Sequence, residues 1–120
     1  GMQVIGIDAD ELDPMIAGHL KDGHIRARAG DLPRRDFSVA KWMLVDSNVK
    51  PDKTLVTVGN IVTHRNNRLR GLLITLKIGD YKSAGLVGRW HQTIEAWNPK
   101  TIRVRQLARN KCEVCFAVEM

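Results

Sequence analysis

The chain has 120 residues, of which 43% are hydrophobic and 27% charged, and its net charge is +6. These values are ordinary for a globular protein, and this length is enough to bury a core without a metal or disulfide staple. No run is apolar for long enough to span a membrane, and no charged segment leads into an apolar run as in a secretory signal. We expect one soluble, cytoplasmic domain over residues 2–120, with Gly1 a remnant of tag removal.

The charge is unevenly distributed along the chain. Residues 1–22 hold five acidic side chains and one basic one, whereas residues 23–120 hold 18 basic and 8 acidic ones. A body this basic attracts polyanions at long range, and nucleic acid is the commonest such partner. The alternative is a solvated basic surface with no dedicated partner.

A short amphipathic helix is predicted near the N-terminus. Asp8 or Asp10 is a candidate N-cap, and Pro14 is compatible with a first helical turn. Apolar residues follow at helical spacing, and Gly23 is a suitable C-terminal stop. These features predict a helix of two to three turns.

Two segments that follow have strand-like features. Residues 24–29 alternate strictly between apolar and polar side chains, which predicts a half-buried strand. Residues 37–45 are apolar without a clear period, so a strand is favoured slightly over a short helix. Residues 46–53 are polar, contain Pro51 and are expected to form a loop.

The stretch from Thr54 to Ile78 has the features of a long β-hairpin. Two runs rich in β-branched and apolar residues flank Asn66-Asn67, and asparagine tolerates the positive φ angles of a tight turn. Gly59 and Gly71 would mark bulges or bends in the two arms. The hairpin would have an apolar base and a basic tip. The base would comprise Leu55, Ile61, Leu72, Leu76 and Ile78.

Three further strands are predicted, at residues 89–97, 101–107 and 112–119, from their alternation. The last would bury Val114, Phe116 and Val118. The predicted fold class is therefore α+β and β-dominated. It has one N-terminal helix and an antiparallel meander of five to seven strands, partly closed as a small barrel.

Arginines at alternating strand positions and at the hairpin tip are the candidate nucleic-acid-binding residues. A guanidinium group binds phosphate through two parallel hydrogen bonds, so such pairs could follow a phosphate backbone. Alternatively, these arginines only keep the sheet faces and the hairpin tip soluble and discourage pairing of exposed strand edges. The candidates are Arg65, Arg68, Arg70, Arg103, Arg105, Arg26 and Arg28.

Most aromatic side chains are expected in the core. Trp90 shares a strand face with Ile94 and is expected to be buried. Trp97 precedes a turn and is the ring most expected at the surface, where it could stack on a base.

The residues offer little for catalysis or metal binding. His91 and Glu95 would lie roughly 13 Å apart on a strand, too far for a hydrogen bond. His64 beside the tip arginines has some likeness to a ribonuclease site. Cys112 and Cys115 form a single C-x-x-C pair without the further ligands of a zinc site. We expect no cofactor and no metal.

Three functions remain open from the sequence. The first is a non-catalytic nucleic-acid-binding accessory protein, with DNA or RNA as its partner. The second is a structural or assembly subunit that forms homo-oligomers through the hairpin or a sheet edge. The third is a small toxin-like ribonuclease that uses His64 or His91.

Overall fold

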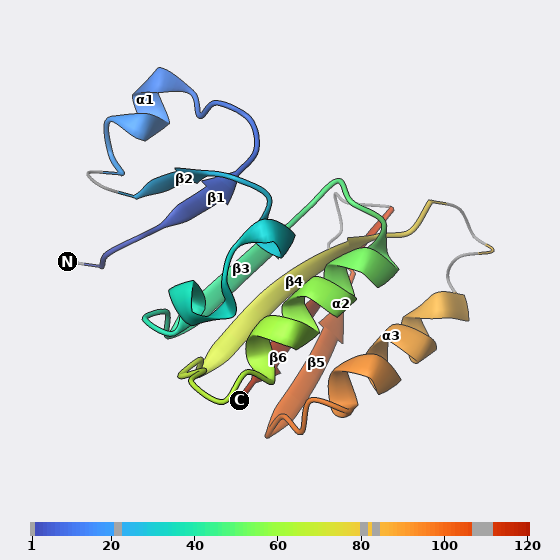
Figure 1. The fold of residues 1–120 in the computed structure, drawn as a ribbon. Helices are drawn as coiled ribbons and strands as arrows, with labels where there is room; N and C mark the ends of the chain where they lie inside the picture. Colours follow the sequence, from blue (N-terminus) through green and yellow to red (C-terminus); the bar gives the residue numbers. More distant parts are fainter. Residues whose placement is uncertain (1, 21–22, 80–81, 83–84, 107–111) are drawn as a thin grey trace. The chain divides into compact units, whose positions relative to one another are not determined.

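A computed structural model describes residues 2–20, 23–79, 82, 85–106 and 112–120. The chain divides into two compact units, Gly1–Pro33 and Arg34–Met120 (Figure 1). The two units carry opposite net charge, since residues 34–120 contain 16 basic and 7 acidic side chains whereas residues 1–33 contain 3 and 6. Within the described residues, no helix is both long and apolar enough to cross a membrane.

The first unit is a parallel pair of short strands. β1 (Gly6–Asp8) pairs with β2 (His24–Arg26), and the 3-10 helix η1 (Ala29–Asp31) follows. Strand β2 is shorter than the predicted strand over residues 24–29, because its partner β1 ends at Asp8, the register partner of Arg26.

The helix between these strands, α1 (Pro14–Ala17), is only one turn long. Its N-cap is Asp13, which accepts a hydrogen bond from the Met15 N–H at 2.8 Å, rather than Asp8 or Asp10. The side chain of Asp8 instead accepts from the Asp10 N–H and forms a local turn. The predicted stop at Gly23 is wrong, because the helix ends at Ala17 with Gly18 as its C-cap.

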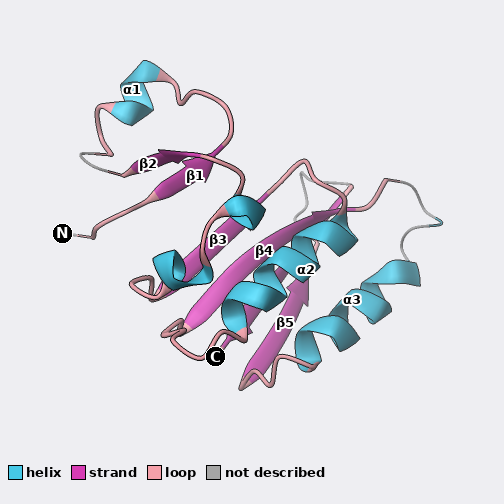
Figure 2. Ribbon diagram, in the orientation of Figure 1, coloured by secondary structure: helices cyan, strands magenta, loops and turns pink. Residues whose placement is uncertain are grey.

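The second unit is a four-stranded mixed sheet with two helices on one face (Figure 2). A 3-10 helix, η2 (Arg34–Phe37), leads into β3 (Trp42–Asp46), and helix α2 (Pro51–Val62) connects it to β4 (Gly71–Lys77). Helix α3 (Leu86–Glu95) precedes β5 (Thr101–Arg105) and β6 (Glu113–Glu119). The strand order is β3-β4-β6-β5, with β3 and β4 parallel and the other pairs antiparallel.

This topology corrects the predicted fold. The chain forms a mixed α/β structure in which the larger sheet is open, with edges at β3 and β5, and is not closed as a barrel. The connection from β3 to parallel β4 requires a crossover, and α2 supplies it.

The predicted hairpin over residues 54–78 is wrong in its first arm, which is helix α2. Pro51 occupies the first helical position, where its missing N–H costs nothing. Leu55, Val58 and Ile61 are buried at helical spacing, so burial of this stripe overrides the β propensity of the segment. The predicted loop at residues 46–53 is therefore shortened to residues 47–50, between β3 and α2. The second arm is confirmed as a strand.

The segment 89–97 is also helical where a strand was predicted. Trp90 and Ile94 are both buried, at 2% and 0% exposure, as the sequence indicated. Residues four apart share a face in both a strand and a helix, so this pair did not distinguish the two structures.

The remaining strand predictions are confirmed in part. Of the predicted segment 37–45, Phe37 ends the 3-10 helix η2, and the strand β3 begins at Trp42 and continues to Asp46. Strand β5 covers residues 101–105 of the predicted 101–107, and β6 covers residues 113–119 of the predicted 112–119. Val114, Phe116 and Val118 alternate with more exposed neighbours and are buried against the helices. The apolar side chains of β4 that were predicted as hairpin base, Leu72 and Leu76, lie in the same core.

The two glycines predicted to be strand bulges instead allow close aromatic packing. A Cβ atom at Gly59, inside α2, would come within 2.9 Å of Trp97 Nε1. Trp97 is thus half-buried against α2 and is not the most exposed ring. At Gly71 a Cβ atom would collide with the ring of Trp42, its register partner on the neighbouring strand β3.

Asp52 joins the two helices of the second unit. Its carboxylate accepts hydrogen bonds from Arg89 Nη2 at 2.9 Å and from the indole Nε1 of buried Trp90 at 3.1 Å. Asp52→Ala would leave the Trp90 donor without this acceptor. We expect the free energy of unfolding to fall by about 1–2 kcal/mol, measured by urea denaturation.

Asp52→Asn is the matched control, because its amide oxygen can still accept from Trp90 while the exposed ion pair to Arg89 is lost. We expect it to cost less than about 1 kcal/mol. Equal losses in the two variants would contradict the role given to the indole hydrogen bond.

Candidate functional site

The connection between α2 and β4 is held in one conformation by hydrogen bonds from Thr63 and Asn67. Both the backbone N–H and the hydroxyl of Thr63 donate to the Gly59 carbonyl, at 2.9 and 2.8 Å. Asn67 Nδ2 donates to the Val62 carbonyl at 2.6 Å, and Asn67 Oδ1 accepts from the Leu69 N–H at 2.9 Å. The side chain of Asn67 therefore satisfies a helix-end carbonyl and fixes the turn that follows.

Removing that side chain is expected to loosen this turn. Asn67→Ala loses both hydrogen bonds, and we expect a loss of about 1–2 kcal/mol in the free energy of unfolding. Asn67→Asp can still accept the hydrogen bond from the Leu69 N–H. It has no donor for the Val62 carbonyl, and its second carboxylate oxygen would repel that carbonyl, so we expect its stability to stay below that of the wild type. Urea denaturation of the three proteins tests this, and wild-type stability in Asn67→Ala would contradict the assigned role.

Leu69 fixes the directions of the two arginines beside it. It is buried, at 7% exposure, while Arg68 and Arg70 on either side are exposed. The backbone N–H of Arg70 also donates to the Lys41 carbonyl at 2.7 Å, which extends the parallel pairing of β3 and β4 by one residue. This bond brings Lys41, which the sequence did not indicate, next to the arginines of the α2–β4 connection.

The segment before β3 forms the other wall of the site. Phe37 is buried at 8% exposure, and its carbonyl accepts from the Ala40 N–H at 3.1 Å. The Ser38 N–H donates to the Arg35 carbonyl at 3.1 Å. These contacts hold Ser38 and Val39 opposite the α2–β4 connection.

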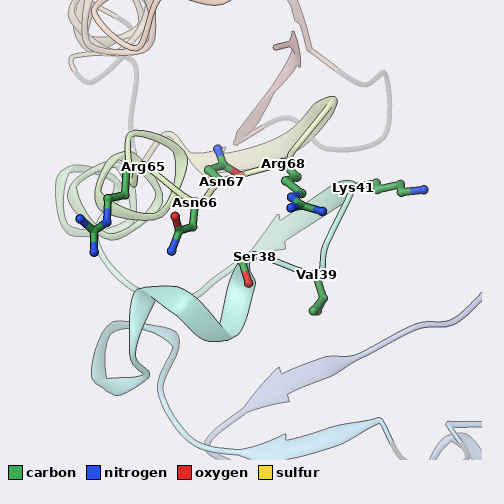
Figure 3. A pocket seen from close by; sticks show the side chains of 7 residues that line it. All are labelled: Ser38, Val39, Lys41, Arg65, Asn66, Asn67 and Arg68. Carbon is green, nitrogen blue, oxygen red and sulfur yellow. The ribbon is translucent and has the colours of Figure 1, made fainter.

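Between these two segments lies an open hollow of about 640 Å³, which we call the basic hollow. Its described lining residues include three cations and no aspartate or glutamate. Figure 3 shows Arg65 at one end, Lys41 extending outward at the other, and Arg68 between them. The residues that line it are Ser38, Val39, Lys41, Arg65, Asn66, Asn67 and Arg68.

The spread of the three cations decides what the basic hollow can bind. A single small anion is held best by donors that converge on one point. Here the charges are distributed along the hollow, which suits a ligand with several separated anionic groups, such as a phosphodiester backbone. The amides of Asn66 and Ser38's hydroxyl add neutral donors along the same wall.

The arginines predicted from the sequence do not gather in one place. Arg65 and Arg68 line the basic hollow, and Arg70 lies next to Lys41 without lining it. Arg103 and Arg105 lie on edge strand β5, at alternate positions that point away from the helices.

The two remaining predicted arginines belong to the first unit. Arg26 Nη1 contacts Glu11 Oε1 at 2.9 Å, and its Nε donates to the Ala9 carbonyl at 3.3 Å. Arg28 precedes η1 in an extended conformation. Arg26 thus already has an acidic partner within its own unit.

A second hollow, of about 410 Å³, lies where α3 leads into β5. His91 and Glu95 line it together with Lys100. The predicted 13 Å separation of the two side chains is wrong because the segment is helical: His91 Nδ1 lies 3.5 Å from Glu95 Oε1. One turn of helix brings together residues that a strand would hold apart.

The other candidate groups show no comparable arrangement. His64 Nδ1 accepts a hydrogen bond from the Asn66 N–H at 3.3 Å, so this nitrogen is engaged in the turn. Cys112 and Cys115 are free thiols. Within the described part of the chain, no group of three or more histidine, cysteine, aspartate or glutamate side chains could hold a metal ion.

Comparison of the chain with protein-family models and with curated proteins finds no match.

Proposed function

We propose that the protein is a non-catalytic nucleic-acid-binding accessory protein, and that the basic hollow is its phosphate-contacting site. The observation that carries the proposal is the set of three cations, Lys41, Arg65 and Arg68, along a hollow whose described lining contains no acidic residue. Arg70 adds a fourth exposed cation beside Lys41.

The surroundings of the hollow support the same proposal. The unit that contains it has 16 basic and 7 acidic side chains, so the long-range field attracts a polyanion toward it. Backbone hydrogen bonds and the buried side chains of Phe37 and Leu69 hold the two walls in place. Binding therefore costs little conformational entropy in these segments. Phosphate contacts of this kind give affinity without sequence preference.

Single-charge variants test the assignment. Lys41→Ala removes a cation from the basic hollow and is expected to raise the Kd for a fluorescent oligonucleotide about three- to tenfold at low salt. Arg26→Ala removes the same charge from the first unit, where the guanidinium already pairs with Glu11, and is expected to change the Kd less than twofold. Anisotropy titrations with single-stranded and duplex DNA and RNA measure both.

A larger effect of Arg26→Ala than of Lys41→Ala would contradict the placement of the interface in the hollow. Equal effects would show that only net charge matters. The same titrations establish which form of nucleic acid is preferred.

A second candidate function is ribonuclease activity, which the 3.5 Å contact between His91 and Glu95 favours. A histidine oriented by a carboxylate can act as a general base, and Lys100 in the same hollow could stabilise a phosphorane. Cleavage of RNA that is lost in His91→Ala and kept in His64→Ala would support this candidate. No cleavage by the wild-type protein would eliminate it.

A further inference from the structure

The sheet of the second unit has one face covered by its own helices and one that they leave uncovered. Helices α2 and α3 lie on the same side of the sheet (Figures 1 and 2). Side chains of the strands alternate between the two faces, so Leu72 and Ile74 point toward the helices and Leu73 points away. We call the side on which no described residue of this unit is helical the open face.

The open face exposes large apolar side chains. Trp42 is 63% exposed, Leu44 78% and Leu73 43%, whereas Leu72 and Ile74 on the other side are 1% and 0% exposed. Leu44 and Leu73 are register partners on adjacent strands, and Ala117 is the next residue in the same row. A contiguous apolar group of this kind on a sheet face indicates a surface that binds another protein.

The charges of the open face distinguish it from the basic hollow. By strand alternation it carries three cations and three acids, so it has no net charge to attract a polyanion. These residues are Lys77, Arg103, Arg105, Asp46, Glu113 and Glu119.

We infer that the open face binds the open face of a second copy of this chain, around a two-fold axis parallel to the strands. The strand order β3-β4-β6-β5 places such an axis between β4 and β6, so that β3 lies over the partner's β5. Asp46 and Arg105 occupy the two ends of one row of the sheet, through Thr75 and Cys115. The axis brings Asp46 next to the partner's Arg105, and this pair occurs twice.

The same axis also brings opposite charges together in the row of Lys77 and Glu113. Lys77 and Glu113 are register partners on the two central strands, so the same axis brings Lys77 next to the partner's Glu113. In the next row Leu73 meets the partner's Ala117, and Leu44 meets the partner's Arg103, whose methylene groups can pack on the leucine. Because packed sheets are rotated by about 30°, these residues meet as nearest neighbours rather than in strict superposition.

The alternative two-fold axis in the plane of the face, perpendicular to the strands, does not fit the charges. Drawn along the row of Leu44 and Leu73, this axis would pair each of these leucines with its own copy. It would also place Arg103 against the partner's Arg103 and Asp46 against the partner's Trp42. Like charges that face each other in an interface are strongly unfavourable, so the pattern selects the axis parallel to the strands.

The size of the open face sets the expected affinity. Four strands about 4.8 Å apart, with five to seven residues at about 3.3 Å each, form a patch roughly 20 Å on a side. Two such patches total roughly 800 Å², which is below the about 1,200 Å² of stable interfaces and in the range of transient ones. We therefore expect a weak, reversible dimer that forms at high micromolar concentration.

Charge reversal tests the arrangement by sedimentation velocity without nucleic acid. Arg105→Asp and Asp46→Arg, each alone, place like charges in both symmetry-related pairs and are expected to raise the dimer Kd about 100-fold. An equimolar mixture of the two variants is expected to restore dimerisation. In the mixed dimer the aspartate introduced at position 105 meets the arginine introduced at position 46, and the native pair forms on the other side.

Both positions are exposed, so each variant should fold, which far-UV circular dichroism verifies. A wild-type chain that stays monomeric from low micromolar to submillimolar concentration would overturn the inference. So would a dimer that neither single variant weakens, or a mixture that stays as weak as the single variants. Because no nucleic acid is present, these outcomes are independent of the proposed function.

Discussion

Reversing two charges in the basic hollow is expected to reduce nucleic-acid affinity about 100-fold at low salt, since each reversal removes one phosphate contact and adds one repulsion. The variant is Arg65→Glu/Arg68→Glu, which alters both arginines that line the hollow. Neither side chain is buried, so the fold should be retained. Anisotropy titration with a labelled single-stranded oligonucleotide measures the effect.

The matched control is Lys50→Glu/Lys53→Glu, at the other end of α2. It changes the net charge of the chain by the same amount, at exposed positions about 14–18 Å along the helix from its C-terminal end. Acidic residues at a helix N-terminus are favourable, so the control should not be destabilised. If both double variants lose affinity equally, binding depends only on the net charge of the chain. That result would contradict the placement of the binding site in the basic hollow.

Phe116→Ala is expected to have the largest effect on stability. Phe116 is 0% exposed at the centre of β6, the strand that pairs with both β4 and β5. Loss of its ring should lower the free energy of unfolding by about 3–5 kcal/mol, because the transfer energy is lost and a cavity remains. That is a large part of the 5–15 kcal/mol typical of a folded domain.

Leu44→Ala is the control for Phe116→Ala. Leu44 also lies on a strand of the same sheet but is 78% exposed, and its truncation should change the stability of the monomer by less than about 0.5 kcal/mol. Urea denaturation at low protein concentration compares the two variants. Equal losses would mean that the core does not lie between the sheet and the helices.

Alternation of apolar and polar residues identified β5 and β6, whereas β3 was predicted from a segment that is apolar without a clear period. In β6, Val114, Phe116 and Val118 alternate with polar or small residues, and this period matches only a strand. The errors arose where one set of residues satisfies two periods. Trp90 and Ile94 share a face in a helix and in a strand, and the β-branched residues of α2 resemble a strand by composition alone.

The candidate site was predicted only in part, because it depends on the topology. Arg65 and Arg68 were identified as a basic group at a turn. Lys41 could not be, since only the parallel pairing of β3 with β4 brings it beside Arg70. Trp42 was expected in the core only as most aromatic side chains were, and it is exposed because no described helix of this unit lies on its side of the sheet.

The most direct test of nucleic-acid binding by the basic hollow is a salt titration of oligonucleotide affinity. Each neutralised phosphate of a single strand contributes about −0.7 to the slope of log K against log salt, so three contacts predict a slope near −2. Arg65→Glu/Arg68→Glu should have a slope closer to zero, and Lys50→Glu/Lys53→Glu should keep the wild-type slope. An affinity that does not change with salt, or no saturable binding near 50 mM salt, would contradict the proposal.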